Sequence, residues 1–137
     1  MIGNSTVISE TDFDRLSHLM ESPRVRTSYA TLLGGLRQEL ASGRVVPPRD
    51  VPRGVVTMNS KVRVRDLATD KAETYTLVYP DDADINEKRL SILAPLGAAL
   101  LGSRTGEVVS FDVPVGTRRL RIERILYQPE AAGHFHL

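Results

Sequence analysis

The spacing of the apolar residues changes once along this chain, from a helical to a strand pattern, and this change limits the folds open to it. Before residue 43, apolar residues recur every three or four positions, whereas beyond residue 60 they alternate with polar ones. Between the two patterns lies SGRVVPPRDVPRG (42–54), whose three prolines and two glycines are typical of a boundary. We therefore predict a helical hairpin in residues 1–45, a linker in 46–54 and an α+β domain in 55–137.

Two short amphipathic helices are expected in the first part. Ser9 and Asp12 form a start signal, in which Ser9 caps the first helix and Asp12 lies near its positive end. Pro23 ends that helix, so residues 21–28 are predicted as a turn, and Gly43 ends the second helix. The apolar stripes are Phe13, Leu16, Leu19 and Met20 in the first helix and Tyr29, Leu32, Leu33, Leu36 and Leu40 in the second. Neither helix is long enough for a self-sufficient coiled coil, so the antiparallel hairpin is expected to lean also on the rest of the protein.

The second part is expected to hold a small antiparallel sheet with one wet face, covered by one short helix. Alternation predicts strands around KVRVRDL (61–67), ETYTLVYP (73–80), EVVSFDV (107–113) and RRLRIERILY (118–127). In the last of these, the inward-facing apolar residues are spaced by two up to Ile122, but the next one is Ile125, three positions later. This change predicts a bulge near Glu123 or Arg124. The helix is expected from Pro95 to Leu101, with its leucines facing the sheet.

Four ordered stretches resemble a known family. They are VVTMNSKVRVRDL (55–67), TLVYPDDAD (76–84), APLGAALLG followed by GEVVSFDVPVG (94–116), and LYQPEAAG (126–133). Together with the short hairpin, they make the chain similar, from about Ser9 to Gly133, to the Gre transcript-cleavage factors (GreA/GreB). Within that family, the chain resembles the shortened Rnk branch, the regulators of nucleoside diphosphate kinase.

This resemblance implies a helical hairpin that projects from a C-terminal domain of FKBP-like fold. In Gre factors that domain docks beside the secondary channel of bacterial RNA polymerase, and the hairpin enters the channel. Paired acidic residues at the hairpin tip help hold a catalytic magnesium ion, so that the polymerase cleaves backtracked RNA. The resemblance therefore implies a cytoplasmic regulator of transcription elongation that binds RNA polymerase, competes with Gre factors and is not itself an enzyme. Nucleic-acid contact is expected only through the polymerase complex.

The predicted hairpin tip departs from the Gre pattern. A helix of about 12 residues spans only about 18 Å. The tip carries one carboxylate, Glu21, and two arginines, Arg24 and Arg26. A hard divalent cation needs several oxygen ligands, and nearby arginines repel it. We therefore expect binding to polymerase without stimulation of transcript cleavage, and contact of the arginines with nucleic-acid phosphate or an acidic channel wall.

The candidate docking residues are Leu93, Ala94 and Pro95, at the start of the predicted short helix. Gre factors usually carry serine where this chain has Ala94, and some carry an acid where it has Leu93. The resemblance implies that this corner and its flanking loops contact the polymerase.

A free-standing FKBP-like module, either a prolyl isomerase or a peptide binder, is the alternative interpretation. Such a pocket needs clustered aromatic side chains around the proline site. The predicted domain offers few aromatic residues: Tyr75, Tyr79, Phe111 and Tyr127, with Phe135 in the tail. Since a shared fold does not carry a shared activity, we favour the polymerase-binding function.

A calcium-loop interpretation of residues 81–93 is disfavoured. Asp82, Asp84 and Asn86 match the spacing of the first ligands, but Glu87 and Leu93 occupy positions that need glycine and glutamate. We therefore expect a solvated loop.

The remaining polar patterns favour no site. His134 and His136 lie near the chain end, and His18 lies in the first predicted helix without a catalytic pattern nearby. Four arginines on one predicted strand are interpreted as a wet sheet face rather than a binding patch. They are Arg118, Arg119, Arg121 and Arg124.

The bulk properties exclude several classes of protein. The net charge is +1 and there are no cysteines, which argues against a strongly basic nucleic-acid binder and excludes thiol chemistry. The N-terminal MIGNSTVISETDFD lacks a signal-peptide pattern, and no apolar run approaches the roughly 18 residues that span a bilayer. No phosphate-binding or nucleophile motif appears, so we expect no enzyme activity, no metal and no cofactor.

Overall fold

Helix α1 (Glu10–Glu21) begins at the predicted cap in the computed structural model, which describes residues 6–137. The Oγ atom of Ser9 accepts a hydrogen bond from the backbone N–H of Asp12 at 3.0 Å. Leu16 and Met20 are buried, as their spacing predicts. The first five residues of the predicted 1–45 segment lie outside the described residues.

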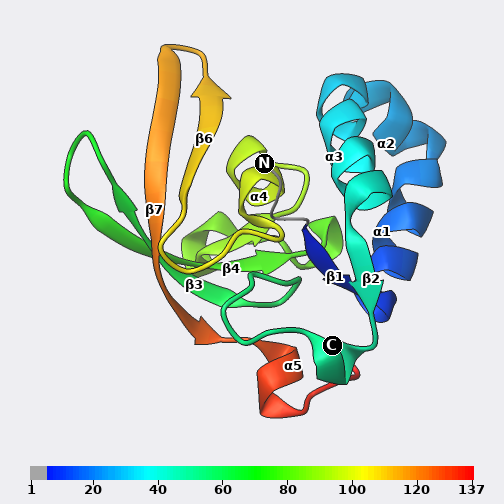
Figure 1. Cartoon of the computed structure of the whole chain (residues 1–137). Helices are drawn as coiled ribbons and strands as arrows, with labels where there is room; N and C mark the ends of the chain where they lie inside the picture. The colour runs from blue at the N-terminus through cyan, green and yellow to red at the C-terminus, as the bar shows by residue number, and fades with distance from the viewer. Residues whose placement is uncertain (1–5) are drawn as a thin grey trace.

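A short helix, α2 (Pro23–Ser28), stands where the sequence predicts a turn. Pro23 occupies the first turn of this helix, where its missing N–H costs no hydrogen bond, so the residue that ends α1 also starts α2. Helix α3 (Ala30–Ser42) follows and runs back beside α1 in the opposite direction (Figure 1). The guanidinium of Arg37 in α3 donates to the carbonyl oxygen of Met20 in α1 at 3.3 Å, which links the two helices.

A small parallel sheet flanks the helices and was not anticipated from the sequence. Strand β1 (Val7–Ser9) pairs in parallel with β2 (Arg44–Val46), and the 3₁₀ helix η1 (Pro48–Asp50) follows. At Gly43, which ends α3 as predicted, a Cβ atom would lie 2.9 Å from the carbonyl oxygen of Glu39 and 3.0 Å from that of Thr6. The close approach of the backbone therefore requires glycine.

A five-stranded sheet forms the second part, in the order β5-β4-β3-β7-β6 (Figure 1). Its strands are β3 (Lys61–Asp66), β4 (Ala72–Val78), β5 (Arg89–Ser91), β6 (Val108–Val113) and β7 (Gly116–Tyr127). Three of the four pairings are antiparallel, as predicted, but the edge strand β5 runs parallel to β4, which corrects the prediction of a purely antiparallel sheet. The α+β class is confirmed.

More than one short helix accompanies the sheet, which corrects the expectation of a single one. Helix α4 (Pro95–Leu100) is the predicted helix, and α5 (Pro129–Ala132) follows the last strand. Two 3₁₀ turns, η2 (Pro80–Asp82) and η3 (Ile85–Glu87), connect β4 to β5. Within the described residues, no helix is both long and apolar enough to cross a bilayer.

The predicted bulge in β7 is confirmed at Glu123. Val64 of β3 lies opposite Ile122, but the preceding residue, Arg63, lies opposite Arg124, so Glu123 is the extra residue. A second irregularity follows at Leu126. Because of the extra residue Glu123, Ile122 and Ile125 both point to the core side of the strand.

One continuous core joins the helices to the sheet. Leu16, Leu36 and Leu40 from the helices belong to the same buried cluster as Leu77 and Ile122 from the strands. This confirms that the short helices lean on the rest of the protein. The leucines of the α4 segment also face this core: Leu96, Leu100 and Leu101.

Candidate functional site

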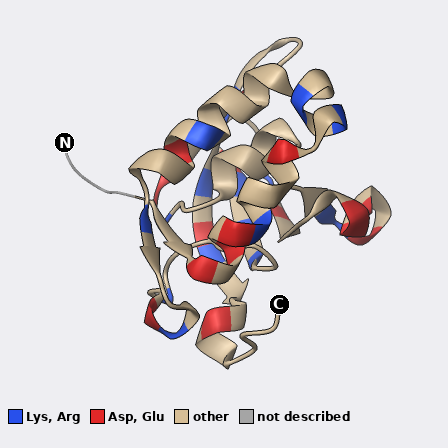
Figure 2. Cartoon of the chain, turned by 90° about the vertical axis from the view of Figure 1, so that its right-hand side faces the viewer, with Lys and Arg blue, Asp and Glu red and all other residues tan. Residues whose placement is uncertain are grey.

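The end of the helical hairpin is formed by the last turn of α1 and by α2. Glu21 closes α1, and Arg24 and Arg26 lie on α2, all with exposed side chains. Val25, between the two arginines, packs against the core and so keeps them turned outward. Figure 2 shows the basic colour without the acidic colour on this short helix. The tip therefore presents two guanidinium groups and a single carboxylate, a poor set of ligands for a divalent cation.

The corner before α4 exposes only part of the predicted docking triplet. Leu93 is buried in the core, Ala94 is half-buried, and Pro95 is exposed. Ser91 holds this corner: its Oγ accepts the N–H of Leu93 and its carbonyl oxygen accepts the N–H of Ala94, each at 3.0 Å. Of the three residues, Pro95 has the most accessible side chain.

Gly97 allows α4 to lie directly against this corner. A Cβ atom at Gly97 would fall 2.1 Å from the carbonyl oxygen of Ser91, far inside any real contact. The position of Pro95 therefore depends on the contact between Gly97 and Ser91.

A buried carboxylate, Asp12, joins the helical hairpin to the rest of the protein. One of its oxygens accepts the backbone N–H of Met58 at 3.1 Å, and the other accepts the hydroxyl of Tyr79 at 3.3 Å. Burial, together with the charge of Glu130, raises the pKa of Asp12 from 3.8 to about 7. Burial and the Asp12 carboxylate in turn raise the pKa of the Tyr79 phenol.

The polar contacts continue from this point toward the C-terminal segment. Thr57, beside Met58, donates its hydroxyl to Glu130 at 2.8 Å, while its backbone N–H donates to Ser60. Gln128 donates its side-chain amide to the carbonyl oxygen of Val55 at 2.7 Å. Segment 55–60 is thus held from both ends of the chain.

Sequence reasoning did not identify this junction. It explained Asp12 by its place at the positive end of a helix, and that place is correct, but the side chain also binds the backbone of a segment 46 positions away. The available signal was an acidic residue on the apolar side of α1, one turn before Leu16. Nothing local indicates the partner.

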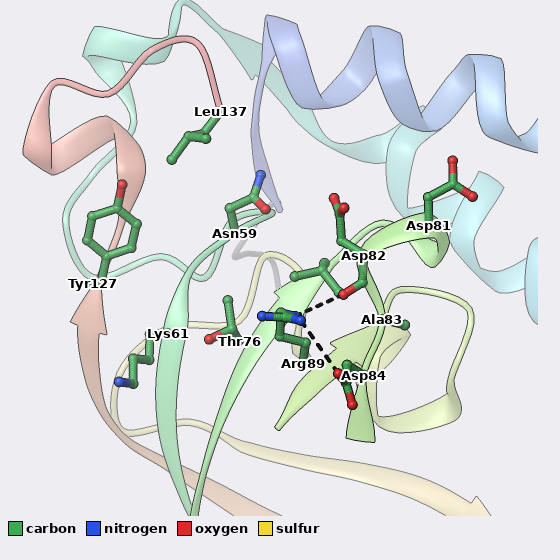
Figure 3. A pocket seen from close by; sticks show the side chains of 11 residues that line it. Asn59, Lys61, Thr76, Asp81, Asp82, Ala83, Asp84, Arg89, Tyr127 and Leu137 are labelled. Atoms are coloured by element: carbon green, nitrogen blue, oxygen red, sulfur yellow. Dashed lines mark hydrogen bonds and ion pairs between the residues drawn. The ribbon is translucent and has the colours of Figure 1, made fainter. Parts of the chain in front are cut away.

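A cavity of about 650 Å³ lies between the acidic loop and one end of the sheet (Figure 3). Of the three aspartates that line it, Asp84 has its side chain engaged within the loop. Asp84 caps η3 through the N–H of Asn86 at 3.0 Å and pairs with Arg89 at 3.6 Å, and Arg89 also donates to the carbonyl oxygen of Asp82. Residues 6–137 hold no cluster of three metal-ligating side chains. This loop is therefore held by its own contacts.

The C-terminal histidines are placed by contacts with earlier elements. The Nδ1 atom of His134 lies 2.6 Å from the hydroxyl of Tyr127, and the backbone oxygen of His136 accepts a hydrogen bond from Arg15 at 3.1 Å. These contacts fasten the chain end to β7 and α1. His18 lies exposed on α1.

A small groove of about 170 Å³ lies between α4 and the core side of the sheet. Tyr75 is the aromatic residue among its lining, which also includes the ion pair between Asp66 and Arg118. Small-molecule sites usually measure about 300–1,000 Å³ and carry several apolar or aromatic groups. The groove gives no support to the alternative interpretation as a prolyl isomerase.

The four arginines of β7 do not form one surface. Arg118 lies opposite Phe111 on the core side of the β6–β7 strand pair and forms an ion pair with Asp66. Arg119 and Arg121 lie on the other face, because successive strand residues point to opposite sides.

Known proteins resemble this chain along most of its length. Residues 51–127 match the family model described as transcription elongation factor, GreA/GreB, C-term. The chain is 38% identical over 134 residues to the regulator of nucleoside diphosphate kinase of Escherichia coli K12, with 96% of each chain covered. It is 34% identical to the transcription elongation factor GreA of Thermodesulfovibrio yellowstonii over 68% of this chain and 59% of that one. A solved GreA/GreB elongation factor from Nitrosomonas europaea superposes with a TM-score of 0.77 at 39% identity, covering 91% of this chain and 100% of that chain.

Proposed function

Because this chain belongs to the GreA/GreB family of transcription elongation factors, we propose that it regulates elongation by docking at the secondary channel of bacterial RNA polymerase. The observation that carries this proposal is the 38% identity over 96% of both chains to a short relative, so the likeness includes the hairpin as well as the C-terminal part. That relative is named for regulation of nucleoside diphosphate kinase, and this second activity does not form part of the proposal.

The C-terminal part supplies the docking surface in this proposal. We place the contact at the corner of Leu93, Ala94 and Pro95, within a domain of FKBP-like fold. Since Leu93 is buried and Pro95 is exposed, Pro95 makes the direct contact and Leu93 holds the corner from inside. The rigid support from Ser91 and Gly97 favours such a role, because a preformed surface loses little entropy on binding.

The hairpin then enters the channel without promoting transcript cleavage. Its tip offers Glu21 as the single carboxylate, and the positive charges of Arg24 and Arg26 repel a metal ion. The buried contacts of Asp12 fix the angle between hairpin and corner, so docking of the corner also directs the tip. The protein therefore acts by occupying the site that Gre factors use.

Competition on core RNA polymerase tests the proposal. Labelled GreA is bound to core polymerase, and unlabelled protein is added while fluorescence anisotropy is recorded. We expect displacement of GreA, together with no increase in transcript cleavage in stalled complexes and inhibition of GreA-stimulated cleavage. Failure to displace GreA would contradict docking, whereas displacement accompanied by cleavage would contradict the function given to the tip.

A matched pair of proline variants tests the corner. Pro95→Ala should weaken the displacement of GreA by about tenfold, because it removes an exposed contact while alanine still starts the helix. Pro114→Ala changes another exposed proline, in the turn between β6 and β7, and should leave displacement unchanged. If both variants displace GreA equally well, the docking surface lies elsewhere on the protein.

A further inference from the structure

Six cationic side chains gather on the sheet face that points away from the core. In β3, Val62 and Val64 are buried, so the intervening residues point outward. Residues directly opposite one another share a face, and Arg124 and Arg121 of β7 lie opposite Arg63 and Arg65. The six residues, which we call the outer basic face, are Lys61, Arg63, Arg65, Arg119, Arg121 and Arg124.

The bulge at Glu123 completes this surface. Simple alternation after Ile122 would turn residue 124 toward the core, but the extra residue brings Arg124 opposite Arg63 instead. Glu123 itself pairs with Arg63 and Arg65, so it holds two guanidinium groups in place on the face. The bulge therefore both adds an arginine and orders two others.

The charge on this face exceeds that of the whole molecule. Three carboxylates lie beside its arginines: Glu123, Asp112 and Asp70. Lys61, at one end of the face, lines the cavity of the acidic loop together with Asp81, Asp82 and Asp84, so it is left out of the charge. Against the five arginines, the three carboxylates leave about +2, whereas the chain carries +1, so the remainder is net acidic. Within residues 6–137, Lys61, Arg119, Arg121 and Arg124 have no carboxylate partner, and their side chains are exposed.

We propose that the outer basic face binds the phosphate backbone of duplex nucleic acid. Five of the six cations are arginines, whose planar guanidinium matches phosphate oxygens in pairs. They stand in rows on adjacent strands, about 6.6 Å apart along a strand and about 5 Å across. Such an array contacts successive phosphates without reading bases.

The composition of the face favours duplex over the other polyanionic partners. Tyr127, opposite Lys61, is the one aromatic residue at the outward positions of β3, β6 and β7, and its hydroxyl contacts His134. These strands therefore offer no row of aromatic side chains on which successive bases could stack. The centres of protein–protein interfaces are poor in charge and rich in apolar anchors, whereas duplex interfaces are strongly positive. This inference does not depend on polymerase docking, since isolated protein and duplex suffice to test it.

Binding to a fluorescein-labelled, mixed-sequence 20-base-pair DNA duplex, measured by anisotropy across a salt series, tests the proposal. Engagement of about four phosphates gives a slope of log affinity against log salt of about −3.6, a loss of about 10²-fold between 50 and 200 mM salt. The double variant R119Q/R121Q should bind at least tenfold more weakly at 50 mM salt and reduce the slope by about 2.

The matched control is R49Q/R53Q, which removes the same charge from two exposed positions outside the face and should leave duplex affinity within twofold of the unmodified protein. E123Q should strengthen binding about threefold to tenfold, because it frees Arg63 and Arg65 for phosphate. Equal weakening by both double variants, no binding at 50 mM salt, or weakening by E123Q would overturn the proposal. Competition by polyglutamate as strong as by unlabelled duplex would also overturn it, in favour of an acidic protein partner.

Discussion

The carboxylate of Asp12 in α1 lies 3.1 Å from the backbone nitrogen of Met58, in the segment that leads into β3. This contact joins two parts of the chain that the hydrophobic pattern separates. The carboxyl group is almost completely buried, and Glu130 adds a second negative charge nearby. Its protonation state therefore influences how firmly the hairpin is attached.

The pKa of Asp12 predicts a fall in stability as pH rises from about 4 to about 7. The Asp12 carboxyl group has its usual pKa of 3.8 in the unfolded chain and a pKa of about 7 in the folded protein. The folded state therefore holds the proton more tightly. The stabilisation is complete below pH 4 and is lost as pH rises through 7, by about 4 kcal/mol at most. Urea unfolding between pH 4 and 8 measures this. Asp12→Asn keeps an acceptor for the N–H of Met58 and should make the free energy of unfolding nearly independent of pH over this range. If the pH dependence is unchanged in the variant, it comes from another titratable group.

Removal of the Tyr79 hydroxyl should raise the pKa of Asp12 further. That hydroxyl donates to the carboxylate at 3.3 Å and stabilises its charged form. Tyr79→Phe is therefore expected to move the carboxyl titration above pH 7 and to cost about 1 kcal/mol of stability. Carbon-13 NMR of the aspartate carboxyl carbons follows the titration directly. A titration at lower pH in the variant would contradict the assigned hydrogen bond.

Two glycine-to-alanine changes should have opposite effects. Gly97→Ala places a methyl group against the backbone of Ser91 and should destabilise the protein by about 1–3 kcal/mol. Gly35→Ala, in α3, meets no atom within 4 Å and should stabilise it by about 0.5–1 kcal/mol. Thermal and urea unfolding measure both. Similar effects of the two changes would show that α4 can move away from the corner.

Leu36→Ala should destabilise the hairpin and the sheet together. Leu36 is 2% exposed and belongs to the core cluster that includes residues of both parts. Loss of its side chain is expected to cost about 2–5 kcal/mol in a single unfolding transition. Gln38→Ala, an exposed change on the same helix, is the control and should have little effect. Separate melting of the helices and the sheet would contradict the shared core.

Much of the local structure could be predicted because its causes lie within a few residues. The Ser9 cap, the start of α4 at Pro95 and the bulge at Glu123 depend on neighbouring side chains and on the phase of burial. The short helix α2 was missed because proline both ends one helix and begins another, and local patterns do not separate these roles.

The exposure of the candidate site residues was predicted only in part. The tip residues Arg24 and Arg26 are exposed, and exposure follows from their charge. Burial of Leu93 beside exposed Pro95 required the packing of the corner on the core, which no local pattern specifies. The outer basic face was also hidden, because its cations come from two strands that the sequence shows as separate charge runs.

The sequence by itself determined the α+β class, helices α1, α3 and α4, the four longest strands and the family, since periodicity and ordered motifs are properties of the chain alone. Tertiary structure alone decided the parallel edge strand β5, the pairing of β1 with β2, the burial of Asp12 and the sharing of one core. These features join residues far apart in the chain. Their energy comes from desolvation and hydrogen bonds that exist only when those distant segments meet.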